Sequence, residues 1–198
     1  GWNQRIGNFG YYVRGNFSYA KNEITNMEEA YQPYAYMYQT GNAIGRYYGL
    51  VAEGFYQQSD FKTDGTLSDG LPVNSFIKNP QPGDVKYKDL NKDGKIDNYD
   101  YTYQLGSELP EINYGFQIGA DYRNLGFNAY FQGVANKTVA TALSSVYVPL
   151  AGGNKNISKH YLKNYWSAER PSGKYPRLTT LDNANNYLNS QIWTEKGD

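Results

Sequence analysis

Apolar and polar residues alternate through Phe9-Gly10-Tyr11-Tyr12-Val13-Arg14-Gly15-Asn16-Phe17-Ser18-Tyr19. One side of the alternation carries Phe9, Tyr11, Val13, Gly15, Phe17 and Tyr19, and the other carries Gly10, Tyr12, Arg14, Asn16 and Ser18. A period of two residues is the pattern of a β-strand whose two faces meet different surroundings. The pattern predicts a strand over residues 9–20.

The same alternation returns twice further along the chain. One copy aligns Ile112, Tyr114, Phe116, Ile118, Ala120 and Tyr122, and the next aligns Phe127, Ala129, Phe131, Gly133 and Ala135. Each copy runs for about ten residues, the length with which a tilted strand crosses a bilayer. We therefore expect membrane strands over residues 9–20, 111–123 and 126–136. A tight hairpin should join the last two, with Asn124 and Gly126 in left-handed conformations.

The connections between these strands are very unequal in length. Residues 21–110 separate the first strand from the second, and residues 137–198 follow the third. Short periplasmic turns alternating with long extracellular loops are typical of a transmembrane β-barrel. The sequence thus predicts an all-β fold in which residues 1–198 form an antiparallel transmembrane β-barrel segment, with 21–110 and 137–198 outside the cell.

A soluble β-sandwich alternates apolar and polar residues in the same way. Aromatic residues decide between the two, because they lie near the ends of the apolar faces while Gly and Ala lie between them. That arrangement is typical of the interfacial belts of a membrane barrel. The composition agrees, since 22 of the 198 residues are tyrosine.

Composition also excludes several classes of function. Lysine plus arginine and aspartate plus glutamate both number 19, so no net charge attracts nucleic acid. Cysteine is absent and His160 is the only histidine, which leaves no Cys/His pair or zinc-hydrolase set, and we expect no enzyme. The chain opens on Gly1-Trp2-Asn3 without a start methionine or signal segment, so we expect a piece of a longer protein.

Residues 89–100 have the spacing of a calcium loop. Oxygen-bearing side chains stand at loop positions 1, 3, 5, 9 and 12, a glycine stands at position 6, and Ile96 at position 8 should pack the loop down. Position 12 is an aspartate where an EF-hand has a longer glutamate, and the alternative is an Asx-rich turn without an ion. The predicted ligands of one structural calcium ion are Asp89, Asn91, Asp93, Asp97, Asp100 and the carbonyl of Lys95.

Aromatic residues of the two long connections are candidates for binding, because loop aromatics stack on sugar rings and anchor protein interfaces. The candidate substrate or partner contacts are Tyr34, Tyr36, Tyr38, Tyr161, Tyr165 and Trp166. The alternative is that these rings pack the loops onto one another. The last three fall in residues 157–167, where helical spacing after Ser158 predicts a short helix.

Several blocks together resemble a known family. They include Gly15-Asn16-Phe17-Ser18-Tyr19, Gly45-Arg46-Tyr47-Tyr48-Gly49-Leu50, Pro82-Gly83-Asp84-Val85-Lys86-Tyr87, Leu109-Pro110-Glu111-Ile112-Asn113-Tyr114-Gly115-Phe116 and Asn164-Tyr165-Trp166-Ser167. In this order they are similar to the late barrel segments of SusC/RagA-type TonB-dependent transporters. The blocks span nearly the whole chain.

The resemblance implies a piece of a 22-stranded barrel that imports oligosaccharides or peptides across the outer membrane of a Gram-negative, Bacteroidetes-like bacterium. It also implies a SusD-like lipoprotein partner and energy coupling to TonB through parts that have no counterpart here. The alternative from the residues alone is a secreted, calcium-stabilised β-rich module that binds carbohydrate or protein.

Overall fold

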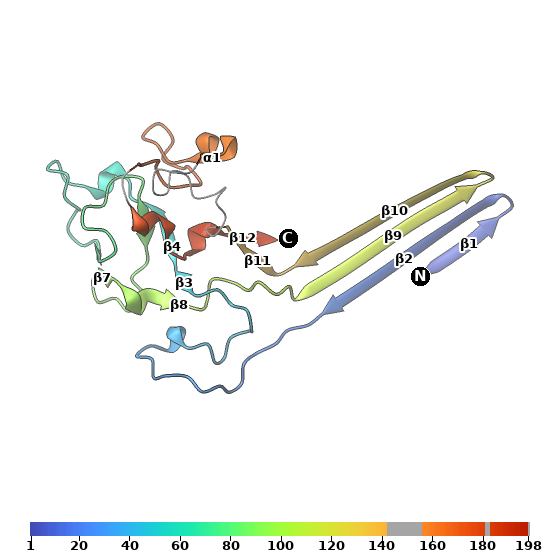
Figure 1. Ribbon diagram of the computed structural model, residues 1–198, viewed down its shortest axis with the longest axis horizontal. Coiled ribbons are helices and arrows are strands. Elements are labelled where there is room, and N and C mark those ends of the chain that lie inside the picture. The colour runs from blue at the N-terminus through green and yellow to red at the C-terminus, as the bar shows by residue number, and fades with distance from the viewer. Residues whose placement is uncertain (142–155, 181–182, 198) are drawn as a thin grey trace.

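The computed structural model describes residues 1–141, 156–180 and 183–197. Parts of the predicted extracellular region 137–198, namely residues 142–155, 181–182 and 198, lie outside the described residues. The described chain consists of a long sheet that projects from a rounded head (Figure 1). No helix in the described residues is long and apolar enough to cross a membrane.

The projecting sheet contains β1 (Trp2–Ile6), β2 (Phe9–Tyr19), β9 (Ile112–Tyr122) and β10 (Leu125–Ala135), side by side in that order and all antiparallel. The last three strands each have 11 residues, as the alternation led us to expect. The sequence analysis missed β1. Its apolar residues Trp2 and Ile6 flank the polar Gln4 on the same face, so the period of two is hidden there.

Two-residue turns close both hairpins at the end of the sheet that lies far from the head (Figure 1). Gly7, with φ of 60°, begins the first turn, and Arg123, with φ of 53°, begins the second. The expectation for Asn124 and Gly126 was therefore wrong. Because Tyr122 pairs with Leu125, Arg123 is the first turn residue and takes the positive φ, while Gly126 already lies in the ladder opposite Asp121.

The pairing register joins the three alternating patterns into one apolar face. Phe9 pairs with Tyr122, which pairs with Leu125, and Val13 pairs with Ile118, which pairs with Ala129. Directly paired residues of antiparallel strands point to the same side of the sheet. The apolar sides of β2, β9 and β10 are thus continuous, and the polar sides form the opposite face.

Aromatic residues are less strictly confined to the ends of this face than expected. Its central row is aliphatic, with Val13, Ile118 and Ala129 side by side. One row away, however, Phe116 pairs with Phe131, with ring centroids 6.4 Å apart. The register, which the sequence of one strand does not reveal, brings these two rings together near the middle.

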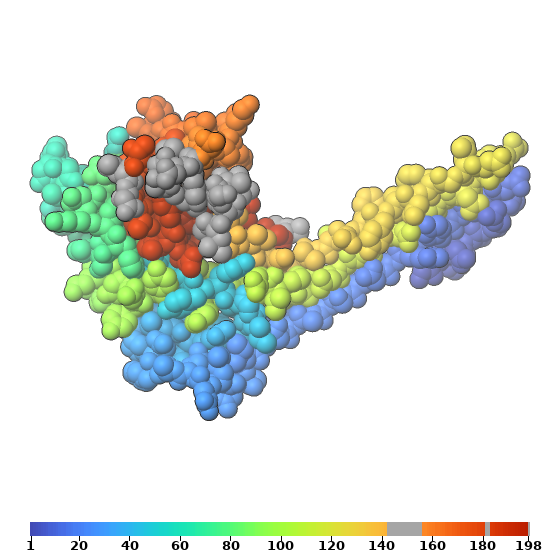
Figure 2. Space-filling view, in the orientation of Figure 1, coloured from blue at the N-terminus to red at the C-terminus, as the bar shows by residue number. Residues whose placement is uncertain are grey.

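Both long connections leave the sheet at the end opposite the turns, and together they build the head (Figures 1 and 2). Short elements make it up: η1 (Ala35–Met37), β3 (Gly49–Leu50), β4 (Ala52–Phe55), η2 (Gln58–Asp60), β5 (Val73–Asn74), β6 (Val85–Tyr87), β7 (Lys95–Ile96), η3 (Asn98–Asp100), β8 (Tyr101–Thr102), β11 (Lys137–Ala140), α1 (Lys159–Asn164), η5 (Ala184–Tyr187), η6 (Gln191–Trp193) and β12 (Thr194–Gly197). Strands pair as β3–β8, β4–β6 and β11–β12, antiparallel, and β5–β7, parallel.

The head has a core shared by the two connections. In one cluster, Leu50, Val85 and Ile96 from the first connection pack with Trp166 from the second. A second cluster holds Tyr161, Tyr175 and Trp193. All three residues of this second cluster belong to the second connection, so only the first cluster joins the two connections through buried apolar side chains.

Candidate functional site

The apolar face of the sheet is open along its length. Phe17 is 70% exposed, Phe127 is 63% exposed and Leu125 is 78% exposed. Contiguous apolar surface of this kind marks a site that another apolar phase or partner covers. On strands of 11 residues, the surface matches the length of a tilted membrane strand.

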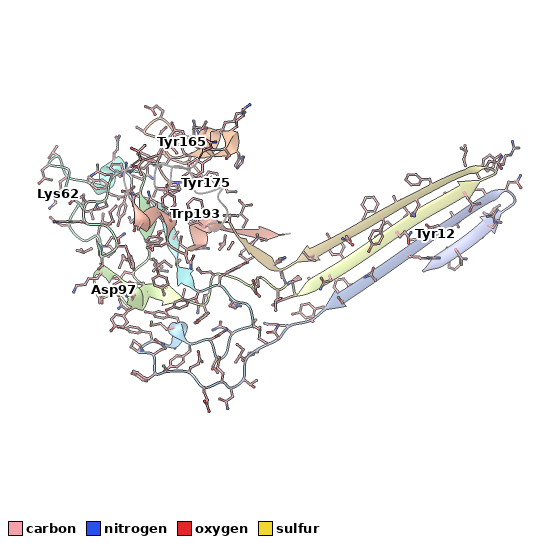
Figure 3. The ribbon with its side chains drawn as sticks, viewed as in Figure 1. Tyr12, Lys62, Asp97, Tyr165, Tyr175 and Trp193 are labelled. Carbon is pink, nitrogen blue, oxygen red and sulfur yellow. The ribbon has the colours of Figure 1, made fainter. Side chains whose placement is uncertain are left out.

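The opposite face is polar and internally bonded. The Arg5 guanidinium donates to Asp121 at 2.6 Å, and the Gln117 amide donates to the Tyr12 hydroxyl at 3.2 Å and to Asn128 at 3.0 Å. Glycine provides the room for the Tyr12 ring, because a Cβ added to Gly119 would stand 2.3 Å from it. Figure 3 shows Tyr12 on the projecting sheet, far from the head. An apolar outer face and a polar inner face are the two sides of a barrel wall.

The tyrosine-rich segment predicted to make contacts packs against the calcium-like loop. The rings of Tyr34 and Tyr36 stack with centroids 5.4 Å apart, and Tyr34 meets Tyr99 edge-on at 6.3 Å. The Tyr36 hydroxyl donates to the Tyr99 carbonyl at 2.7 Å. Burial, with Asp100 nearby, raises the pKa of Tyr36 to about 12, so this hydroxyl stays protonated at neutral pH. Tyr38 instead bonds to the Gln32 backbone.

The loop over residues 89–100 uses its carboxylates as acceptors for its own backbone. Asp89 accepts from the amides of Lys92 and Gly94, Asp93 accepts from Lys95, and Asp97 accepts from Tyr99. Ile96 is fully buried, so it does pack the loop against the head. Among the described residues, no three acidic or histidine side chains come together as a metal-holding group. Calcium binding stays a prediction.

The last ligand position of this loop lies inside the head. Asp100 is fully buried, and its carboxylate accepts from the amides of Leu90 at 2.7 Å and Asp97 at 2.8 Å. Burial raises the pKa of Asp100, and these two amides act in the opposite direction. The loop is therefore closed at both ends by its own hydrogen bonds.

The three candidate contacts of the second connection lie in or beside the core. Tyr161 is 1% exposed and Trp166 is 7% exposed, and Tyr165 lies near Tyr175 and Trp193 (Figure 3). Tyr161 belongs to α1, whose first turn is capped by Ser158, as predicted. The structure thus favours the packing interpretation for Tyr161 and Trp166. Tyr165 remains partly exposed, with Arg170 over its ring at 5.6 Å.

Sequence reasoning missed the polar centre of the head. Asp84 is fully buried, and its carboxylate accepts from Arg177 at 2.6 Å, Asn183 at 2.8 Å, Asn186 at 3.0 Å and the Gln81 amide at 2.8 Å. Asp84 belongs to the first connection and three of its donors to the second. The only local signal was the conjunction of proline, glycine and aspartate in the block over residues 82–84.

Gly83, next to Asp84, allows the Trp166 ring to pack against the backbone. Gly83 has φ of 89°, and a Cβ there would stand 2.3 Å from the Trp166 ring. Only glycine combines this backbone conformation with so close an approach. Two of the recognised sequence blocks, around Gly83 and around Trp166, therefore meet at one contact.

Two curated relatives, both from Formosa agariphila, match this chain. TonB-dependent receptor P26 is 33% identical over 115 residues, which is 52% of this chain and 10% of that protein. TonB-dependent receptor P3 is 27% identical over 137 residues, 69% of this chain and 12% of that protein. The chain is similar to a segment of each of these two TonB-dependent receptors. It spans only about a tenth of the length of these relatives. No family model matches it.

Solved structures with a similar fold match nearly the whole of this chain. The RagAB peptide importer in its open-open state matches with a TM-score of 0.58 over 97% of this chain and 19% of that chain, at 16% identity. Its closed-closed state matches with a TM-score of 0.53 over 98% of this chain and 20% of that chain, also at 16% identity. At this identity the likeness shows the fold, and it confirms the prediction of an all-β barrel segment, here an open piece of the barrel.

Proposed function

We propose that this receptor segment supplies wall strands and part of the extracellular head of a TonB-dependent importer in the outer membrane of a Bacteroidetes-like bacterium. The observation that carries the proposal is the register of β2, β9 and β10, which aligns three apolar sides into one exposed face. In a membrane barrel, lipid would cover this apolar face, and the polar face would point to the water-filled interior.

The names of the similar proteins support import as the function of the whole protein. Two curated relatives are named TonB-dependent receptors, and a structure of similar fold is a peptide importer. The substrate is an oligosaccharide or a peptide, and a SusD-like lipoprotein closes the extracellular mouth over the head. Coupling to TonB belongs to the rest of the receptor. In this proposal the segment forms barrel wall and head, and we assign it no catalytic role.

The alternative, a secreted binding module, fits the structure less well. A soluble sandwich covers the apolar face of each sheet with a second sheet. Here Phe17, Phe127 and Leu125 remain open, and the head lies beyond the end of the sheet instead of over its face (Figure 2).

Neighbouring positions on β9 test the membrane assignment. The chain has no cysteine, so Phe116→Cys and Gln117→Cys each add a single thiol to it. In the full receptor in native membranes, we expect a charged, water-soluble methanethiosulfonate to label Gln117→Cys at least tenfold faster than Phe116→Cys. A spin label at Phe116→Cys should collide more often with oxygen than with a water-soluble nickel chelate. The unsubstituted receptor gives the background, and equal labelling of the two thiols would contradict the assignment.

Calcium would have a structural role in this head, and titration of the full receptor tests it. We expect Ca²⁺ to raise the melting temperature of the receptor, and we expect Asp93→Ala to abolish this rise because it removes one predicted ligand oxygen. Asp69→Ala, on another exposed loop of the same connection, is the matched control and should keep the rise. A melting temperature that does not respond to Ca²⁺ would refute calcium binding.

A further inference from the structure

A groove of about 840 Å³ lies on the head, between β4 and the loop that begins at Pro171. One wall is the edge of β4, and the other belongs to the second connection. Gln57 links the two walls, because its amide donates to the carbonyl of Phe55 at 3.0 Å and to that of Pro171 at 3.4 Å. No part of the proposed function uses this groove.

The edge of β4 along this groove has no partner strand. Within the described residues, β4 pairs only with β6. The second connection does run beside the preceding strand β3, where Leu50 bridges Ser190 and the Leu50 amide donates to the Asn189 carbonyl at 2.8 Å. After Ser190 the chain turns into η6 and does not continue as a strand beside β4.

The pairing register turns the backbone of Phe55 toward the groove. Phe55 lies opposite Val85, whose amide and carbonyl bond to the side chains of Asn186 and Asn185 on the far side of β6. Directly opposite residues of an antiparallel pair either exchange both backbone hydrogen bonds or both face away from each other. Phe55 therefore presents an amide donor to the groove, with a carbonyl that keeps a second lone pair beside its bond to Gln57.

The neighbouring Gly54 leaves room for another chain at this edge. It has φ of 125°, and a Cβ added to it would meet no atom within 4 Å. A glycine inside a strand often marks a bulge, which β4 has here, or the close approach of another backbone.

The unpaired charge on the described walls of the groove is negative. The Asp60 carboxylate lies 3.8 Å from the Lys86 ammonium, and the Lys174 ammonium lies 2.7 Å from the Glu195 carboxylate. Glu53 is exposed and forms no ion pair with a described residue. Its carboxylate favours a cationic group on the ligand.

We propose that this groove binds an extended peptide, which pairs with β4 through the backbone of Phe55 and places a lysine or arginine side chain near Glu53. Such strand addition needs a free strand edge, and backbone hydrogen bonds supply its affinity. The volume is within the ~300–1,000 Å³ of small-ligand sites, so a short peptide fits the groove and a folded domain does not. The inference rests on the proposed import function and names a basic peptide as the imported solute.

Saturation-transfer NMR on the full receptor in detergent tests this binding, with the capped peptide acetyl-Ala-Lys-Ala-Ala-amide as the probe. We expect the signal to fall at least threefold when the backbone amides of the peptide are methylated, because methylation removes the donors for the Phe55 carbonyl. It should fall at least threefold in Glu53→Gln as well. Glu28→Gln is the matched control, because Glu28 is exposed on the same connection and does not line the groove, and it should leave the signal unchanged.

Protection of an added thiol locates the peptide. The chain has no cysteine, and Ser172 lines the groove whereas Ser59, on η2, does not. With saturating peptide, a maleimide should label Ser172→Cys at least threefold more slowly and Ser59→Cys at an unchanged rate.

Equal signals for the peptide and its methylated form, or binding of maltotetraose in place of the peptide, would overturn the inference. Unchanged labelling of Ser172→Cys would overturn it too. If Phe116→Cys and Gln117→Cys still label unequally in that case, the membrane assignment stands and only the peptide site fails.

Discussion

Asp84→Ala is expected to disrupt the head of the receptor and leave the projecting sheet in place. The substitution removes the common acceptor of Arg177, Asn183, Asn186 and the Gln81 amide, all within 3.0 Å of a fully buried carboxylate. Removing one partner of a buried ion pair costs about 3–5 kcal/mol. The Arg177 side chain is 24% exposed, so water would reach its charge only in part. Since the donors come from both connections, the loss should loosen the two together.

Hydrogen exchange of the full receptor measures this effect. In Asp84→Ala, amides of β6 and η5 should exchange at least a hundredfold faster, while those of β9 and β10 should keep their protection. Asp69→Ala is the control, since Asp69 forms a surface ion pair with Lys62 and its side chain is 93% exposed. Such pairs contribute about 0–1 kcal/mol. Unchanged protection of β6 in Asp84→Ala would show that the network does not hold the head together.

Three of the four strands of the sheet were predictable from sequence because their information is local. Each of β2, β9 and β10 carries its own period of two, and any one of them could be assigned without knowing its partners. In a barrel wall the apolar sides of neighbouring strands all face lipid, so a barrel implies one shared apolar face. What the sequence did not contain was the register, which put Arg123 into the turn and paired Phe116 with Phe131 near the middle of the face.

The head was not predictable in the same way because its decisive contacts join distant residues. Asp84 meets Arg177 across 93 positions and Asn186 across 102 positions of the chain. Its strands are only two to four residues long, too short for a period to show. Trp166 and Tyr161 looked like surface aromatics in a polar region, yet Gly83 and Tyr175 provide the surfaces that bury them.

The local pattern of the sheet and the long-range contacts of the head reflect the different surroundings of these two parts. A wall strand faces lipid on one side and polar surroundings on the other, so its sequence records its environment residue by residue. The described part of the head has only short strands, and a buried polar network and stacked rings hold it together. Such networks are costly when incomplete, which makes the head the part most sensitive to single polar substitutions.

Ile118→Arg is expected to have the largest effect of any single substitution in the sheet. Ile118 lies in the central row of the apolar face, between Val13 and Ala129. An arginine at the bilayer midplane of a barrel costs about 2–4 kcal/mol when it faces lipid. The adjacent Gln117 points to the polar face, where it bonds to Tyr12 and Asn128, so Gln117→Arg places the same charge one residue away in polar surroundings.

Folding of the full receptor from urea into lipid vesicles compares the two substitutions. Ile118→Arg should lower the urea midpoint of folding, and Gln117→Arg should lower it by less than half as much, because its charge stays solvated. Thin bilayers should reduce the penalty of Ile118→Arg, since a shorter hydrocarbon core brings the guanidinium closer to the headgroups. Equal penalties for both variants, or a penalty that does not depend on bilayer thickness, would mean that the aligned apolar face does not contact lipid.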